Sequence, residues 1–279
     1  GHGDVGADAL TRQLGRAAAD ADRPVSAEIP GYQEQTLANG LRVIVAEKPG
    51  LPLFSANLTI KRGSTADPAA LAGLAAMTAD VATRGTATRS ATDLAREIES
   101  LGASLNASAG PDMTDISAGG RSDKAAQIFD LMADVVLNPA FAEEELERAR
   151  SETLDNLRVG LRQPGTVAGY ALRRALFGAG AYGRVETETT LNNIAVADLT
   201  AYRETHWRPD NAVLVIAGDI SAQEGFDLAE AALGEWAKPE EDLAPQMYTQ
   251  EGGVGDPRAI AIDIPQIQQA AVMMGAYGP

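Results

Sequence analysis

The segment Gln35–Glu47 (QTLANGLRVIVAE) contains the sequence feature that most restricts how this chain can fold. Its Asn39-Gly40 pair separates two runs of β-type residues, and this dipeptide between such runs is the strongest short-range signal for a β-hairpin. A hairpin joins antiparallel strands, whereas parallel strands need a longer crossover connection. We therefore expect the sheet to begin with an antiparallel pair.

Further strands and helices follow the hairpin without strict βαβ alternation. Alternating or short apolar runs predict strands over Leu53–Lys61, Ser104–Ala109, Met113–Gly119 and Ala212–Ala217. Helical spacing and capping residues predict helices over Ala7–Arg23, Gly73–Thr86, Ser90–Gly102, Ser122–Leu137, Ala142–Arg162, Gly165–Phe177, Ala195–His206 and Ser221–Trp236. The expected fold class is α+β, with helices layered on a mixed, mostly antiparallel sheet.

Changes in composition divide the chain into four segments. Residues 1–30 read as an Ala-rich helix and linker, and residues 31–237 as the main α+β domain. Residues 238–257 are rich in Pro, Gly and acidic residues, which is typical of a linker. Residues 258–279 hold two predicted strands, Ala259–Ile264 and Gln268–Gly275, too few for a domain. They join the preceding sheet, pair with another molecule or begin a second, truncated domain, and we favour the last.

The charge balance restricts the class of partner. The formal net charge of −16 argues against binding of nucleic acid or of anionic membrane surfaces. It suits a basic or extended peptide, although acidity is also a common way for a protein to stay soluble. No run of about 18 apolar residues is present, so we expect no membrane insertion.

The counts of cysteine and histidine restrict the chemistry. The chain has no cysteine, which excludes disulfides, thiol catalysis and cysteine-bound zinc, and its histidines are His2 and His206. A conventional catalytic zinc site would therefore need almost only carboxylate ligands, which is rare. A Ser-His-Asp arrangement would need His206 as its base. For His206, which precedes a buried strand, we favour a packing or hydrogen-bonding role.

Six blocks of sequence, in order, resemble the M16 family of zinc metallopeptidases, which includes pitrilysin, insulinase and the mitochondrial processing peptidase. The resemblance starts at about Gln35. Each block alone is weakly specific, and the ordered set is specific. The blocks are LANGLRVIVAE, GSTADPAALAGLA, Gly85-Thr86, ELERARSETLDNL, AYGR at 181–184 and WRPDNAVLVIAGDI at 207–220.

In active members of this family, a His-x-x-Glu-His motif lies on the helix after the Gly-Leu-Ala of the second block. The two His bind zinc, the Glu polarises the zinc-bound water, and a distal Glu completes the ligand set. Aligned without gaps, these four positions fall on Ala76, Ala79, Asp80 and Asn156. Alanine has no donor atom, and three protein ligands are the usual minimum for catalytic zinc. We therefore expect no catalytic residue and no bound metal in this chain.

The resemblance implies a role beside an active enzyme. Members of the family combine homologous halves around a chamber, and often one pair has lost its metal ligands and helps to bind peptide. The chain is thus interpreted as a non-catalytic subunit or segment. It would complete the chamber of a catalytic M16 partner or fused half, which would carry the zinc, and would help to bind extended peptide. The stretch Ser104–Ala109 suggests one further role, because in the family a strand edge near the active-site helix pairs with the peptide. The sequence does not fix which strand plays this part here.

Two alternatives remain open. One is an assembly scaffold without peptide handling, as the core subunits of the respiratory bc1 complex are in this family. The other is a hydrolase that uses His206. Inactive bacterial subunits often carry an Arg/Tyr substrate-binding pair in the second half, and those positions would lie beyond Pro279. The resemblance favours the bacterial periplasm, whereas the substrate and the oligomeric state are not predicted.

Two further patterns receive structural interpretations. The charged run Glu143–Arg150 is expected to form a solvated helix face joined by ion pairs. Tyr182-Gly183, which matches a family turn without its His, is expected to be a turn.

Overall fold

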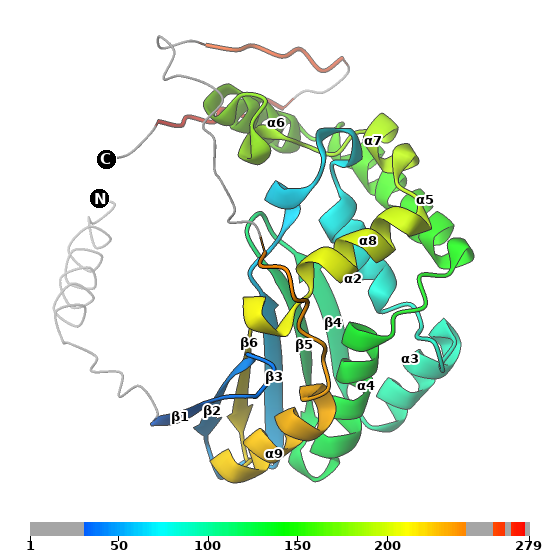
Figure 1. Cartoon of the computed structure of the whole chain (residues 1–279). Helices are drawn as coiled ribbons and strands as arrows, with labels where there is room; N and C mark the ends of the chain where they lie inside the picture. The colour runs from blue at the N-terminus through cyan, green and yellow to red at the C-terminus, as the bar shows by residue number, and fades with distance from the viewer. Residues whose placement is uncertain (1–30, 244–258, 266–268, 277–279) are drawn as a thin grey trace, which may run out of the picture. The chain divides into compact units, whose positions relative to one another are not determined.

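The computed structural model describes residues 31–243, 259–265 and 269–276 (Figure 1). All of these except Gly31 belong to one unit, Tyr32–Pro279. The predicted helix Ala7–Arg23 lies outside the described residues, as does most of the predicted linker 238–257. In the described part of the chain, no helix is both long and apolar enough to cross a membrane.

The described strands form one mixed sheet in which antiparallel pairing dominates. Its six strands have the order β1-β2-β6-β3-β5-β4, and β2 and β6 form its parallel pair. This arrangement confirms the expected α+β class. The predicted hairpin is β1 and β2, and Gly40 in its turn has a φ of 93°, a value that glycine adopts most readily. The strands are β1 Tyr32–Thr36, β2 Arg42–Glu47, β3 Leu53–Ile60, β4 Ser104–Ala109, β5 Thr114–Arg121 and β6 Ala212–Gly218.

One face of the sheet forms the core. Val43, Leu214, Leu58 and Ile116 stand in one row across β2, β6, β3 and β5, and all are fully buried. Burial of each such side chain contributes about 1.5–3 kcal/mol. Helices α4 (Ala125–Leu137) and α9 (Ala222–Leu233) pack on this sheet (Figure 1), and Phe129 of α4 stacks on Phe54 of β3 with ring centroids 5.9 Å apart.

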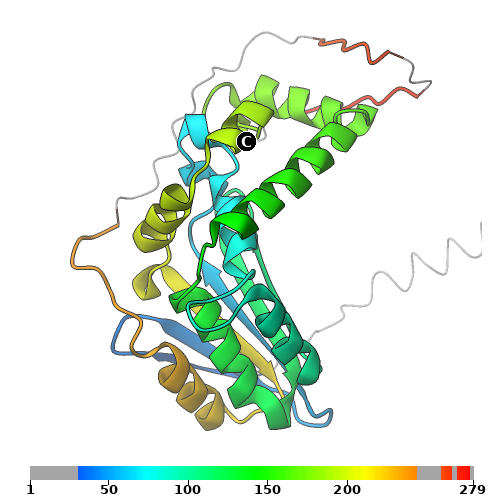
Figure 2. The ribbon, with the colours of Figure 1, turned by 90° about the vertical axis from the view of Figure 1, so that its right-hand side faces the viewer.

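Most predicted helices are present, and their starts follow the expected capping chemistry. The Ser90 and Ser221 hydroxyls accept hydrogen bonds from the Asp93 and Glu224 backbone N–H groups. Helices α5 and α6 meet in a V (Figure 2). The short helix α7 was not predicted. The remaining helices are α2 Leu74–Ala82, α3 Ala91–Ser100, α5 Glu143–Gly160, α6 Pro164–Phe177, α7 Glu188–Asn193 and α8 Val196–His206.

The two strands predicted near the C-terminus are wrong over the residues that are described. Residues 259–265 and 269–276 form neither helix nor strand. A strand is stabilised by a ladder of hydrogen bonds to a neighbour, and these segments pair with no strand of the described sheet. The second domain over 258–279 therefore stays a prediction, as do the other proposed boundaries.

Candidate functional site

Helix α2 starts at a glycine that is held by a buried carboxylate. Asp67 Oδ2 accepts a hydrogen bond from the Gly73 N–H at 2.9 Å, and Oδ1 accepts from the Ala75 N–H at 3.0 Å. Gly73 has a φ of 104°, and a Cβ there would lie 3.0 Å from Leu191. Burial raises the pKa of Asp67 to about 6, against the opposing effect of the backbone N–H groups at the helix start and of Arg184. The glycine and the aspartate together fix where α2 begins.

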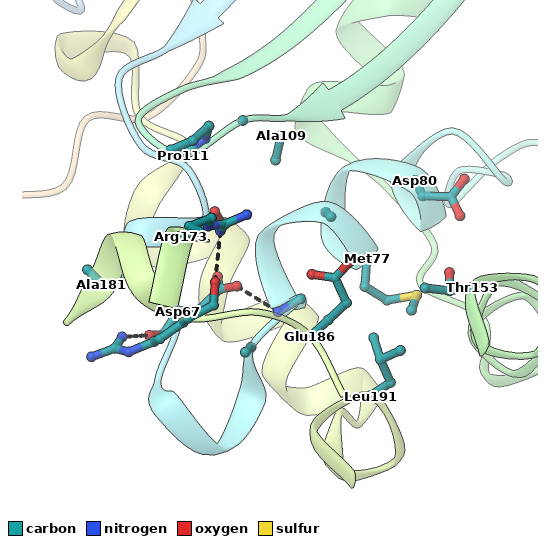
Figure 3. Close-up of a pocket in the computed structure, with 16 residues that line it drawn as sticks. Asp67, Met77, Asp80, Ala109, Pro111, Thr153, Arg173, Ala181, Glu186 and Leu191 are labelled. Carbon is teal, nitrogen blue, oxygen red and sulfur yellow. Dashed lines mark hydrogen bonds between the residues drawn. The ribbon is translucent and has the colours of Figure 1, made fainter. Parts of the chain in front are cut away.

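The outward side of α2 lines a cavity of about 380 Å³. In Figure 3, Arg173 and Asp67 lie toward one end of this cavity, Asp80 and Thr153 lie toward the other, and the Glu186 carboxylate lies between them. The lining residues are Ser64, Asp67, Ala72, Gly73, Ala76, Met77, Asp80, Ala109, Gly110, Pro111, Thr153, Arg173, Ala181, Arg184, Glu186 and Leu191.

The three motif positions on α2 face different surroundings. Ala76 is exposed and lines the cavity together with Asp80, whereas Ala79 is fully buried. Asp80 forms an ion pair of 3.0 Å with Arg84, which follows the end of α2, and the same Arg84 nitrogen lies 2.6 Å from Glu152 of α5. The Arg84 guanidinium lowers the pKa of Glu152. Asp80 is thus held in an ion-pair network.

The fourth motif position does not line the cavity. Asn156 is exposed on α5, and Thr153, nearly one turn earlier, is the α5 residue that lines the cavity. The ranges 31–243, 259–265 and 269–276 contain no group of three or more His, Cys, Asp or Glu residues arranged to hold a metal. Ala76, Asp80 and Thr153 do not fit a catalytic zinc, which needs three protein ligands of the His, Cys, Asp or Glu type. The absence of a catalytic residue and of bound metal stays a prediction.

The edge strand beside α2 is β4. It is the last strand in the sheet order, and its end, Ala109, lines the cavity. The Gly110 N–H donates to the Met113 carbonyl at 2.8 Å, and bonded pairs alternate along an antiparallel ladder. The N–H groups of Ala107 and Ala109 therefore point away from β5, toward the open edge. The sequence did not indicate this strand's edge position.

Two arginines at the cavity were not identified from the sequence as site residues. Arg173 donates from Nε to the Tyr182 carbonyl and from Nη2 to the Arg184 carbonyl, each at 2.8 Å. Arg184 donates from Nη1 to the Asp67 carbonyl at 2.6 Å. Arg184 belongs to the AYGR block, which could have identified it as a candidate site residue. No motif or pattern in the sequence pointed to Arg173. The predicted turn at Tyr182-Gly183 is present as the 3₁₀ turn Ala181–Gly183.

His206 lies away from these groups. It is not among the cavity's lining residues, and its ring packs edge-on against Tyr202 with centroids 4.6 Å apart. Burial, together with the positive charge of Arg62, lowers the pKa of His206 to about 4. The ring is therefore neutral near pH 7, and its surroundings agree with the packing role that the sequence favoured.

Comparison with known proteins identifies relatives of this arrangement. Residues 42–184 match the family described as insulinase (peptidase family M16), and residues 193–279 match the peptidase M16 inactive domain. The chain is 32% identical over 209 residues to the mitochondrial-processing peptidase subunit beta of Bos taurus. This match covers 74% of this chain and 42% of that protein. It is 29% identical over 210 residues to the cytochrome b-c1 complex subunit 1 of Homo sapiens, and this match covers 74% of this chain and 43% of that protein.

A solved structure agrees with these matches. The crystal structure of a peptidase M16 inactive domain from Pseudomonas fluorescens superposes with a TM-score of 0.69 and 27% identity, over 76% of this chain and 53% of that one. The chain spans about half the length of the curated relatives it matches. From the family match and the shared fold, the chain belongs to the M16 (insulinase) family of peptidases.

Proposed function

We propose that the chain is a non-catalytic M16 subunit or segment that helps an active zinc metallopeptidase of the same family to hold extended peptide. The observation that carries this proposal is the cavity on the outward side of α2. Where active members place zinc ligands, the cavity is lined by Ala76 and by an Asp80 that is paired with Arg84. A cavity of about 380 Å³ is present at these positions, without the histidines that usually bind zinc.

The peptide would lie along the open edge of β4. Ala107 and Ala109 offer outward backbone N–H groups there, and Ala109 and Gly110 line the cavity. Addition of a peptide strand to a sheet edge uses main-chain hydrogen bonds, which tolerate many sequences, while an adjoining pocket selects side chains. The edge and the cavity together therefore suit an extended peptide.

The zinc and the general base would come from a catalytic partner or from a fused half. One relative is named as a subunit of a processing peptidase, and the similar solved structure is that of a peptidase M16 inactive domain. Because the chain spans about half the length of its curated relatives, a second homologous half is the natural candidate for completing the chamber. In this role the chain holds the substrate and the partner hydrolyses it.

The test combines elemental analysis with a hydrolysis assay. The purified chain is expected to hold no stoichiometric zinc and to leave a quenched fluorescent peptide intact. A partner with the His-x-x-Glu-His motif, captured from the native source, is expected to cleave the peptide faster when the chain is added. Stoichiometric zinc together with chelator-sensitive hydrolysis by the chain alone would overturn the proposal.

A second candidate is an assembly scaffold, which the similarity to a subunit of the cytochrome b-c1 complex favours. A scaffold would associate with a larger complex and would not alter peptide binding by a peptidase. Capture from the native source separates the two candidates, because a peptidase partner supports the first and an unrelated complex supports the second.

A further inference from the structure

The end of the cavity next to Asp67 is built around two arginine side chains that are held in place by backbone carbonyls. Arg173 binds the carbonyls of Tyr182 and Arg184, and Arg184 in turn binds the carbonyl of Asp67. The Nε atom of Arg184 is buried and has no hydrogen-bond partner among the described residues. A guanidinium carries five N–H groups, so both side chains keep donors for a ligand. Their geometry is fixed before a ligand arrives.

Neither of these guanidinium groups forms an ion pair with a described carboxylate, although the charge of Arg184 acts on the nearby Asp67 carboxylate. Within the described residues, no Asp or Glu lies within ion-pair distance of Arg173 or Arg184, although the chain has 39 acidic and 23 basic residues. The carboxylate of Asp67 accepts from the backbone of α2. Two positive charges that share one end of a cavity without an ion-pair partner favour an anionic ligand.

The one carboxylate that points into the middle of the cavity belongs to Glu186 (Figure 3). It accepts a long hydrogen bond of 3.4 Å from the Tyr170 hydroxyl. At the far end, Asp80 is already paired with Arg84. The cavity is therefore polarised. At one end, the two positive charges of Arg173 and Arg184 outweigh the one carboxylate of Asp67, whereas Glu186 and Asp80 lie farther along. The arginine end is thus the one that favours a further carboxylate.

We infer that Arg173 and Arg184 form a carboxylate subsite for the peptide that lies along β4. The inference rests on the proposed peptide-binding function and deepens it by naming the chemistry that the cavity selects. The carboxylate belongs either to an acidic side chain or to the C-terminus of the peptide, since both present the same planar anion to a guanidinium. The remaining wall is small and apolar, with Ala72, Ala76 and Ala109 among its residues, so it accommodates the stem of that residue.

The test measures dissociation constants by fluorescence anisotropy for a dye-labelled, extended peptide in matched forms. One arm compares a free C-terminus with an amidated one, and the other compares an internal Glu with Gln. In the wild-type chain, one of these neutralisations is expected to weaken binding about tenfold, the usual scale for a hydrogen bond to a charged group. The arm that responds identifies the source of the carboxylate.

Variants then assign the effect to the subsite. In Arg173→Gln and in Arg184→Gln, the difference between the charged and the neutral peptide is expected to shrink to about twofold or less. Arg174→Gln is the matched control, because Arg174 is the next residue of α6, is exposed and does not line the cavity. Glu186→Gln is expected to tighten binding of the charged peptide, since it removes a like charge. Thermal melts of each variant identify any loss of folding, and two arginine variants keep the test informative if one fails to fold.

Four outcomes overturn the subsite. Peptides that bind equally well in charged and neutral forms, or a difference that persists in both arginine variants, would leave peptide binding intact and remove the carboxylate subsite. A preference for basic peptides that Glu186→Gln weakens would assign the cavity to a cation instead. Failure of every peptide to bind would overturn the proposed function together with the subsite.

Discussion

Arg84, just after the end of α2, and Glu152 of α5 form an ion pair of 2.6 Å between Nη2 and Oε2. The same nitrogen lies 3.0 Å from Asp80, the residue that the sequence predicts at the position of the second zinc-binding histidine. A positively charged side chain thus neutralises the one carboxylate that is left on this face of α2. The network also links α2 to α5, the two helices that supply the metal ligands in active members.

Replacement of Arg84 by Gln is expected to lower the thermal midpoint by about 2–4 °C, since partly exposed ion pairs are individually weak. The side chains of Arg84, Asp80 and Glu152 are 21%, 43% and 53% exposed. Arg96→Gln serves as the control, because Arg96 and its partner Asp93 are both more than half exposed. Circular dichroism melts measure the midpoints, and equal values for the two variants would contradict a linking role.

Asp67 is expected to make stability fall as the pH rises from about 4 to 6. Its pKa is about 6 in the folded chain and about 3.9 in an unfolded chain. Between these values the folded state binds more proton than the unfolded state, so raising the pH favours unfolding. The difference in unfolding free energy between wild type and Asp67→Asn is expected to fall by roughly 2–3 kcal/mol across this window. Urea unfolding at several pH values measures it, and parallel curves for the two proteins would contradict the assignment.

His206 is expected to act in the opposite direction. Its folded pKa of about 4 lies below the unfolded value of about 6.5. The unfolded state therefore binds more proton between these values, and stability is lost as the pH falls through them. His206→Phe keeps a ring against Tyr202 and removes this loss of stability at low pH. In this variant, the decrease in stability that Asp67 causes as the pH rises from about 4 to 6 is expected to be more pronounced. The same urea series tests this, and a variant with the wild-type pH profile would contradict it.

Features that depend on local chemistry were predictable from the sequence. The β1–β2 hairpin follows from Asn39-Gly40, and the start of α3 follows from the Ser90 cap, because each signal lies within a few residues of its effect. The strand predicted over Ala259–Ile264 failed because a strand needs a partner. The sequence could name Ala76 and Asp80 as motif positions, whereas it could not predict the cavity that these two residues line.

The missed residues share one physical reason. Arg150 was expected on a solvated face, yet it is buried and donates to the carbonyls of Leu191 and Ile194 at the end of α7. Arg173 likewise binds carbonyls on a distant turn. Every residue carries a backbone carbonyl, so the partner of an arginine that binds a carbonyl can be of any residue type. The sequence therefore does not mark that partner, as an acidic residue would mark an ion pair. Such contacts emerge only once the chain path is known.

The open edge of β4 provides the sharpest test of peptide binding. Proline removes a backbone N–H, which an edge strand tolerates where that N–H points outward. The ladder alternation set by Gly110 and Met113 directs the N–H of Ala107 outward and that of Ser108 toward β5. Ala107→Pro is therefore expected to weaken peptide binding about tenfold or more and to leave the thermal midpoint nearly unchanged.

Ser108→Pro is the matched control for this edge. It removes an N–H that belongs to the β4–β5 ladder, so its main effect is expected to be a lower thermal midpoint, because proline inside a ladder breaks a hydrogen bond and strains the strand. Fluorescence anisotropy measures peptide affinity, and circular dichroism measures the midpoint. If Ala107→Pro binds peptide as tightly as the wild type and keeps its midpoint, the peptide does not add to β4. The cavity beside α2 would then have to bind its ligand without strand addition.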